Sequence, residues 1–123
     1  MHGTFKNGLP KIDVTVIGSG GVEHTVNVIV DTGFNGGLTM PYHTAFPIGL
    51  TLAGVSSGIV ADGSESPCLV CLGKVKYNDT RVDTTIELQP DCRPLLGTQL
   101  LKDLGLRFIV DATKEEFSIE QIR

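Results

Sequence analysis

The chain has 123 residues, of which 41% are hydrophobic and 20% are charged, as is typical of one soluble globular domain. Its formal net charge is −4 and its basic residues are scattered, which argues against a nucleic-acid-binding surface. No apolar run reaches the roughly 18 to 20 residues that cross a bilayer, so no membrane partner is expected. We therefore expect a single domain over residues 1–123, and a cytoplasmic location because the segment MHGTFKNGLP lacks a signal-peptide core.

The first half of the chain predicts short strands separated by turns. Ile12, Val14 and Val16 alternate with polar residues, and a glycine-rich turn at 18–21 leads into an apolar run over 22–30, which predicts a hairpin. Residues 38–40 predict a short strand that ends at a proline. The segment YHTAFPIGL that follows predicts a helical turn, kept short by its own proline.

The second half predicts two further hairpins and one helix. Residues 52–60 and about 68–76 are predicted to form the arms of one of these hairpins, because Asp-Gly between two extended runs favours a tight turn. A strand over 82–88 follows. Residues 98–104 predict a helix with Thr98 as N-cap and Gly105 as its stop. Residues 106–110 and 116–120 predict the last hairpin, so the fold class expected is all-β with one short C-terminal helix.

The cysteine and histidine residues do not predict a metal site. Three cysteines is an odd number, which fits free thiols in a reducing compartment. Cys68 and Cys71 have the spacing of a metal knuckle, but three positions along a strand point two side chains to opposite faces. Buried free cysteine is therefore the preferred interpretation. His2, His24 and His43 are too dispersed for a triad or a ligand set, and we expect neither metal nor cofactor.

The stretch VIGSGGVEHTVNVIVDTGFNGG contains the beginnings of two different functional motifs. A dinucleotide-binding loop would need Gly-x-Gly-x-x-Gly followed by a helix, but the third glycine position holds Glu23 and the next residues are β-branched. A carboxylate there would repel the phosphates. The glycines at 18–21 are better explained as a hairpin loop. The alternative motif is Asp31-Thr32-Gly33, which follows an apolar strand and precedes two more glycines.

Three segments together resemble the retropepsin-like aspartic peptidases, the half-sized relatives of pepsin. VIVDTGFNGGLTMP, VADGSE and PLLGTQLL occur in the order and rough spacing of the small prokaryotic members of this family. The resemblance covers nearly the whole chain. It implies a closed acid-protease barrel in which the element at 95–97 packs behind the active-site loop. It also implies that Asp31, Thr32 and Gly33 are catalytic, and that Ala61, Asp62, Gly63 and Ser64 form a flap that binds the substrate. Asp62, Asp91 and Asp111 lie in predicted turns and otherwise read as structural.

The chemistry of this family needs two carboxylates, and the chain offers one Asp-Thr-Gly. One carboxylate must be ionised to take a proton from water, and the other protonated to polarise the scissile carbonyl. The resemblance therefore implies a C2 homodimer with half of the site on each chain. We expect its interface to include the segment FSIEQI at 117–122, which looks like an exposed sheet edge. The predicted activity is hydrolysis of a peptide or protein substrate; the alternative is a catalytically inactive dimeric module of the same fold that binds peptides.

Overall fold

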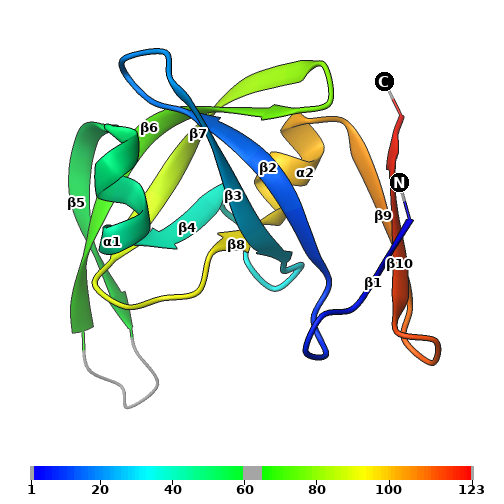
Figure 1. The fold of residues 1–123 in the computed structure, drawn as a ribbon. Coiled ribbons are helices and arrows are strands. Elements are labelled where there is room, and N and C mark those ends of the chain that lie inside the picture. Colours follow the sequence, from blue (N-terminus) through cyan, green and yellow to red (C-terminus); the bar gives the residue numbers. More distant parts are fainter. Residues whose placement is uncertain (1, 60–64, 123) are drawn as a thin grey trace.

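The computed structural model describes residues 2–59 and 65–122, which fold mainly into β-strands (Figure 1). In chain order the elements are β1 (His2–Thr4), β2 (Lys11–Ile17), β3 (Glu23–Val30), β4 (Leu38–Pro41), α1 (Tyr42–Ala45), η1 (Phe46–Ile48), β5 (Thr51–Ile59), β6 (Glu65–Tyr77), β7 (Thr80–Gln89), β8 (Leu95–Leu96), α2 (Thr98–Asp103), β9 (Leu106–Asp111) and β10 (Glu116–Gln121). No helix among the described residues is long and apolar enough to cross a membrane.

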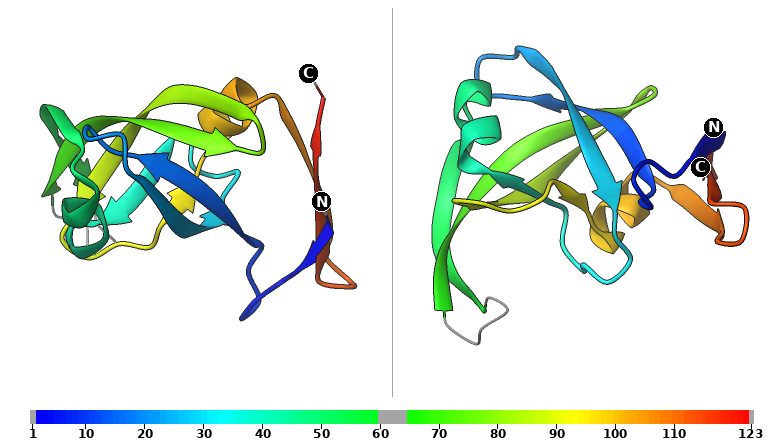
Figure 2. Two further views of the ribbon diagram at one scale, coloured as in Figure 1. Left: turned by 45° about the horizontal axis from the view of Figure 1, so that its top comes forward. Right: turned by 60° about the horizontal axis from the view of Figure 1, so that its bottom comes forward.

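The strands form two sheets, one of which closes on itself. The larger sheet has the order β2-β3-β8-β4-β7-β6-β5, and an additional pairing of β2 with β6 closes it into a barrel. The smaller sheet has the order β1-β10-β9 and stands at one side of the barrel, with the two ends of the chain close to it (Figures 1 and 2). The predicted all-β barrel is therefore confirmed.

The first hairpin forms where the sequence predicts it. The buried side chains of Ile12, Val14 and Val16 alternate along β2 with more exposed residues, and β2 pairs antiparallel with β3 along its whole length. Gly21 closes the turn with a φ of 78°, a conformation that is open to glycine at little cost. The Gly21 N–H donates to the carbonyl of Gly18 over 3.0 Å.

Both sheets contribute to one hydrophobic core. Leu38, Met40, Ile86, Leu96 and Leu100 are completely buried at its centre. They come from β4, β7, β8 and α2, so Leu96 of the two-residue strand β8 is as deeply buried as the central residues of the longer strands. Burying one such side chain stabilises the fold by about 1.5–3 kcal/mol. Phe117 and Ile119 of β10 belong to the same cluster, which joins the small sheet to the barrel.

The strand β8 connects segments that lie far apart in the sequence. It pairs parallel with the end of β3, with Val30 opposite Leu96, and antiparallel with the start of β4, with Leu38 opposite Leu96. The loop at 31–37 that joins β3 to β4 therefore begins and ends beside the same two-residue strand (Figure 1).

Two details differ from the sequence prediction. The helix α2 begins at Thr98, and its N-cap is Gly97 rather than Thr98. The strand β10 is not an edge, because β1 pairs with it on one side and β9 on the other. The prediction that 117–122 forms an exposed sheet edge was therefore wrong for Phe117 and Ser118, which pair with β1. It overlooked the pairing of His2–Thr4, a strand too short for sequence periodicity to reveal.

Candidate active site

The carboxylate of Asp31 lies just beyond the end of β3, on the short loop that leads to β4. Asp31 is half-buried, whereas Thr32 and Gly33 are exposed. The backbone N–H of Gly33 donates to Asp31 Oδ1 over 2.8 Å, which fixes the carboxylate relative to its own loop. The N–H of Phe34 donates to the carbonyl of Asp31 over 3.2 Å and completes a tight turn. A side chain at Gly33 would crowd the carboxylate, since its Cβ would lie 3.2 Å from Asp31 Oδ1.

The segment 96–98 holds this loop from behind through three backbone hydrogen bonds. The Asp31 N–H donates to the carbonyl of Leu96 over 3.0 Å, and the Gly97 N–H donates to the carbonyl of Gly37 over 2.8 Å. The Thr98 N–H donates to the carbonyl of Phe34 over 2.9 Å. The family resemblance implied that this apolar-apolar-Gly element would pack behind the loop, and the hydrogen bonds confirm it.

Asp31 also borders a hollow in the surface of about 470 Å³. Its other lining residues come from the segment before β2, the end of β3 and the segment leading into β8: Leu9, Pro10, Ile29, Val30, Arg93 and Leu95. The hollow is mostly apolar beside the carboxylate, and Arg93 brings a cation to it. No sequence motif marks Arg93, and the sequence did not predict it as a site residue. Its one signal was its position two residues before Leu95, just ahead of the element at 95–97 predicted to lie behind the loop.

Comparisons with solved structures match this arrangement. The EIAV protease complexed with the inhibitor HBY-793 superposes with a TM-score of 0.61 at 16% sequence identity, over 83% of this chain and 93% of that one. The retroviral protease-like domain of Ddi1 from Leishmania major superposes with a TM-score of 0.55 at 16% identity, over 95% of this chain and 92% of that one. The chain has the retropepsin-like fold. No protein-family model and no curated protein matches the sequence.

Within this retropepsin-like fold, only part of the predicted site can be located. Asp31, Thr32 and Gly33 stand together on the loop between β3 and β4. The flap residues Ala61, Asp62, Gly63 and Ser64 lie outside the described residues. The arms of that hairpin are described, and β5 pairs antiparallel with β6 as far as Ile59 and Glu65.

The cysteines of the retropepsin-like barrel are free thiols. Cys71 lies opposite Ile86 in the ladder between β6 and β7 and belongs to the core, whereas the buried Cys68 is not part of that cluster. Burial raises the pKa of the Cys71 thiol above its usual value, and the neighbouring Cys68 adds to the effect. Burial likewise raises the pKa of the half-buried Cys92. Over residues 2–59 and 65–122, no group of three or more His, Cys, Asp or Glu side chains could hold a metal ion.

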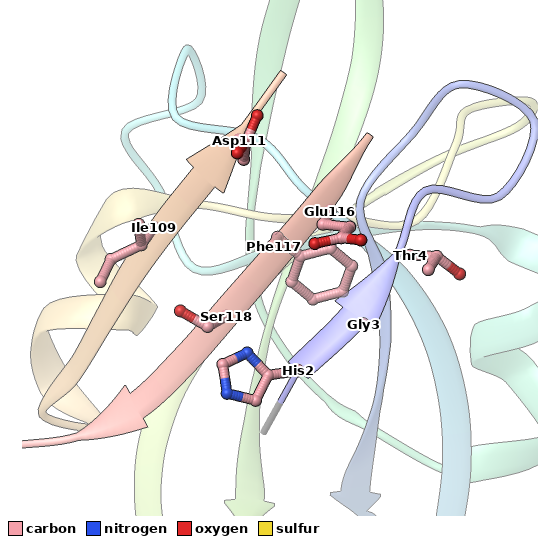
Figure 3. A pocket seen from close by; sticks show the side chains of 8 residues that line it. All are labelled: His2, Gly3, Thr4, Ile109, Asp111, Glu116, Phe117 and Ser118. Atoms are coloured by element: carbon pink, nitrogen blue, oxygen red, sulfur yellow. The ribbon is translucent and has the colours of Figure 1, made fainter. Parts of the chain in front are cut away.

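A second hollow, of about 360 Å³, lies on the small sheet and shares no lining residue with the hollow beside Asp31 (Figure 3). Its lining residues are His2, Gly3, Thr4, Ile109, Asp111, Glu116, Phe117 and Ser118. Asp111 and Glu116 face each other across the register of β9 and β10, and both are exposed. Hydrogen bonds from the Thr113 hydroxyl and the Lys114 N–H lower the pKa of Asp111, so this carboxylate is occupied with closing its own turn. We assign it a structural role.

Proposed function

We propose that the protein is an aspartic endopeptidase whose active site forms when two copies of the chain bring their Asp31 carboxylates together. One observation carries this proposal: among the described residues that line its hollow, Asp31 is the only one with a carboxylate. Peptide hydrolysis by this chemistry needs a pair of carboxylates, so the second must come from another chain. A twofold axis beside Asp31 would supply it, with the same loop on both sides.

The proposed mechanism divides two roles between the paired carboxylates. Two carboxylates that meet at a twofold axis share one proton, because the repulsion between two adjacent negative charges opposes ionisation of both. The ionised member takes a proton from a water molecule while the water oxygen attacks the scissile carbonyl carbon. The protonated member gives its proton to the carbonyl oxygen. The tetrahedral intermediate then collapses, the C–N bond breaks, and the amine leaves with a proton from the dyad.

Neighbouring residues would prepare the site for this reaction. The Gly33 N–H that donates to Asp31 Oδ1 orients the carboxylate before substrate arrives. The exposed hydroxyl of Thr32 would hydrogen-bond across the dimer and hold the two loops in register, as the family resemblance implies. The family resemblance assigns substrate binding to residues 61–64, which follow β5 in the sequence and lie outside the described residues. Three free thiols suit a reducing compartment such as the cytosol.

The proposed activity is tested with purified protein and a mixed peptide library at several values between about pH 4 and 7. We expect cleavage that an inhibitor resembling the tetrahedral intermediate blocks. The Asp31→Asn variant should lose activity by about 10³-fold or more because it removes the general base. Asp91→Asn, a change at an exposed turn aspartate, is the matched control and should remain active. Undiminished cleavage by Asp31→Asn, or no cleavage by the unmodified protein, would contradict the proposal; the latter would favour the peptide-binding module.

A further inference from the structure

The hollow beside Asp31 continues into a neighbouring hollow, distinct from the one on the small sheet, and the two form one groove. They share three lining residues, Leu9, Ile29 and Arg93. The neighbouring hollow has a volume of about 540 Å³ and is also lined by Asn7, Lys11, Asn27 and Pro94. We call the combined feature the cationic groove, since it leads from the Asp31 carboxylate past Arg93 to Lys11.

Hydrogen bonds hold the walls of the cationic groove in place. The N–H of Ile29 donates to the carbonyl of Pro94 over 2.9 Å, and the N–H of Val30 donates to the carbonyl of Pro10 over the same distance. The buried hydroxyl of Thr39 donates to the carbonyl of Arg93 over 2.8 Å. The backbone that carries Arg93 is therefore fixed relative to β3, the strand that leads into the loop of Asp31, and a recognition site requires such a fixed backbone.

The charges in the cationic groove are unbalanced away from Asp31. Lys11 and Arg93 are its two cations, and within the described part of the chain neither takes part in any of the four salt bridges. The carboxylate of Asp13, two residues along β2 from Lys11, accepts a hydrogen bond from Asn27 Nδ2 over 2.9 Å. Asp13 is thus engaged with Asn27, and the exposed guanidinium of Arg93 is open to an anion from outside.

We propose that the cationic groove is a specificity subsite that selects an acidic side chain in the substrate, with Arg93 as the main recognition group. This inference rests on the proposed function, because it assumes that the scissile bond lies at Asp31. Arg93 and Asp31 border the same hollow, so the acidic residue lies next to the scissile bond or close to it in an extended peptide. The planar guanidinium can bind a carboxylate through two parallel hydrogen bonds, and Lys11 extends the positive region for longer side chains.

The test compares peptides that differ only in Glu, Gln or Lys at each position on either side of the cleaved bond. At one position we expect kcat/KM for Glu to exceed that for Gln by about fivefold, since exposed ion pairs contribute modestly. The Glu preference should weaken at high salt and disappear as the pH falls below about 4.3, where the substrate carboxylate is protonated. Arg93→Ala should remove the preference and Arg93→Glu should shift it to Lys. Arg107→Ala, which removes an exposed cation on β9 outside the groove, should leave it unchanged.

A binding measurement separates this inference from the proposed activity. The Glu, Gln and Lys peptides are titrated into Asp31→Asn protein, with and without the additional Arg93→Ala change. One outcome is that the unmodified protein cleaves none of the peptides, while the Glu peptide binds about fivefold more tightly than the Gln peptide and loses this advantage with Arg93→Ala. The subsite then stands and the peptidase proposal fails. If the unmodified protein cleaves with equal kcat/KM for Glu, Gln and Lys at every position, the subsite is overturned and the peptidase stands. Binding and cleavage that are both insensitive to peptide charge and to Arg93 overturn the inference as well.

Discussion

Gly97 lies directly against the backbone of Gly36, so closely that a Cβ atom on Gly97 would overlap the Gly36 carbonyl oxygen. The same Cβ would also lie 2.7 Å from the carbonyl oxygen of Phe34. Both contacts are with the loop that carries Asp31. The position of the candidate catalytic carboxylate therefore depends on the absence of a side chain sixty-six residues further along the chain.

Replacing Gly97 with alanine should destabilise the protein and disturb the loop. Because the obstructing atoms belong to the backbone, they cannot rotate away, and overpacking of this kind costs about 1–3 kcal/mol. We expect Gly97→Ala to lower the free energy of unfolding by that amount and to reduce peptide cleavage further than stability alone explains. Gly20→Ala is the matched control, because a Cβ there would meet nothing within 4 Å. Equal free energies of unfolding for the two variants in chemical denaturation would contradict this prediction, because they would show that the loop backbone moves to accommodate the added Cβ.

Removing the hydroxyl of Thr39 should loosen the segment that carries Arg93. Thr39 Oγ1 donates to the carbonyl of Arg93 over 2.8 Å and accepts from the N–H of Leu95 over 3.1 Å. Thr39→Val keeps the shape but leaves both backbone groups without this partner, so we expect a loss of about 1–3 kcal/mol in unfolding free energy. Thr39→Ser retains the hydroxyl and should lose less. If Thr39→Val and Thr39→Ser proved equally stable, the hydroxyl bridge would be unimportant.

Stability should decline in alkaline solution. Burial raises the pKa of the Cys71 thiol and of the Tyr77 hydroxyl above their usual values. These groups keep their protons in the folded state at a pH where the unfolded chain releases them. The stabilisation that these protonated groups give the folded state is therefore complete below about pH 8.5 for Cys71 and about pH 10 for Tyr77. It is lost as the pH rises through the raised pKa of each group in the folded state.

Thermal melting across this range measures the effect. We expect a constant Tm between about pH 7 and 8 and a falling Tm above about pH 9, with a shallower fall above about pH 10 in Tyr77→Phe. The phenylalanine variant keeps the ring in the core but has no hydroxyl to ionise. A Tm that stays level up to about pH 11, or a fall that is unaffected in Tyr77→Phe, would contradict this explanation.

The sequence predicted those features that depend on local patterns. Alternation of Ile12, Val14 and Val16 predicted the first hairpin, and Asp-Thr-Gly after an apolar strand predicted the loop of Asp31. The family resemblance added the element behind that loop. Thr98 was mistaken for the N-cap because hydroxyl side chains favour that position, whereas the close approach of the Asp31 loop requires glycine at the preceding residue.

The remaining features depend on pairing between distant segments. Arg93 reaches the Asp31 hollow only because β8 pairs with the end of β3, some sixty residues earlier in the chain. The central position of β10 likewise depends on its pairing with His2–Thr4 at the other end of the chain. Neither relationship leaves a periodic signal in the sequence, since one strand has two residues and the other three.

The central claim is that each active site takes one Asp31 from each of two chains, and mixed dimers test it most directly. Unmodified protein and Asp31→Asn protein are unfolded together in equal amounts, refolded, and assayed for peptide cleavage against the same total of unmodified chain refolded alone. If both carboxylates are required, random pairing leaves only about half of the unmodified chains with an unmodified partner, and activity falls to about one half. With a larger excess of Asp31→Asn protein, the activity per unmodified chain should fall further, in proportion to the fraction of unmodified chains in the mixture. Activity that stays unchanged as Asp31→Asn protein is added would contradict a shared site, because each unmodified chain would then be catalysing hydrolysis by itself.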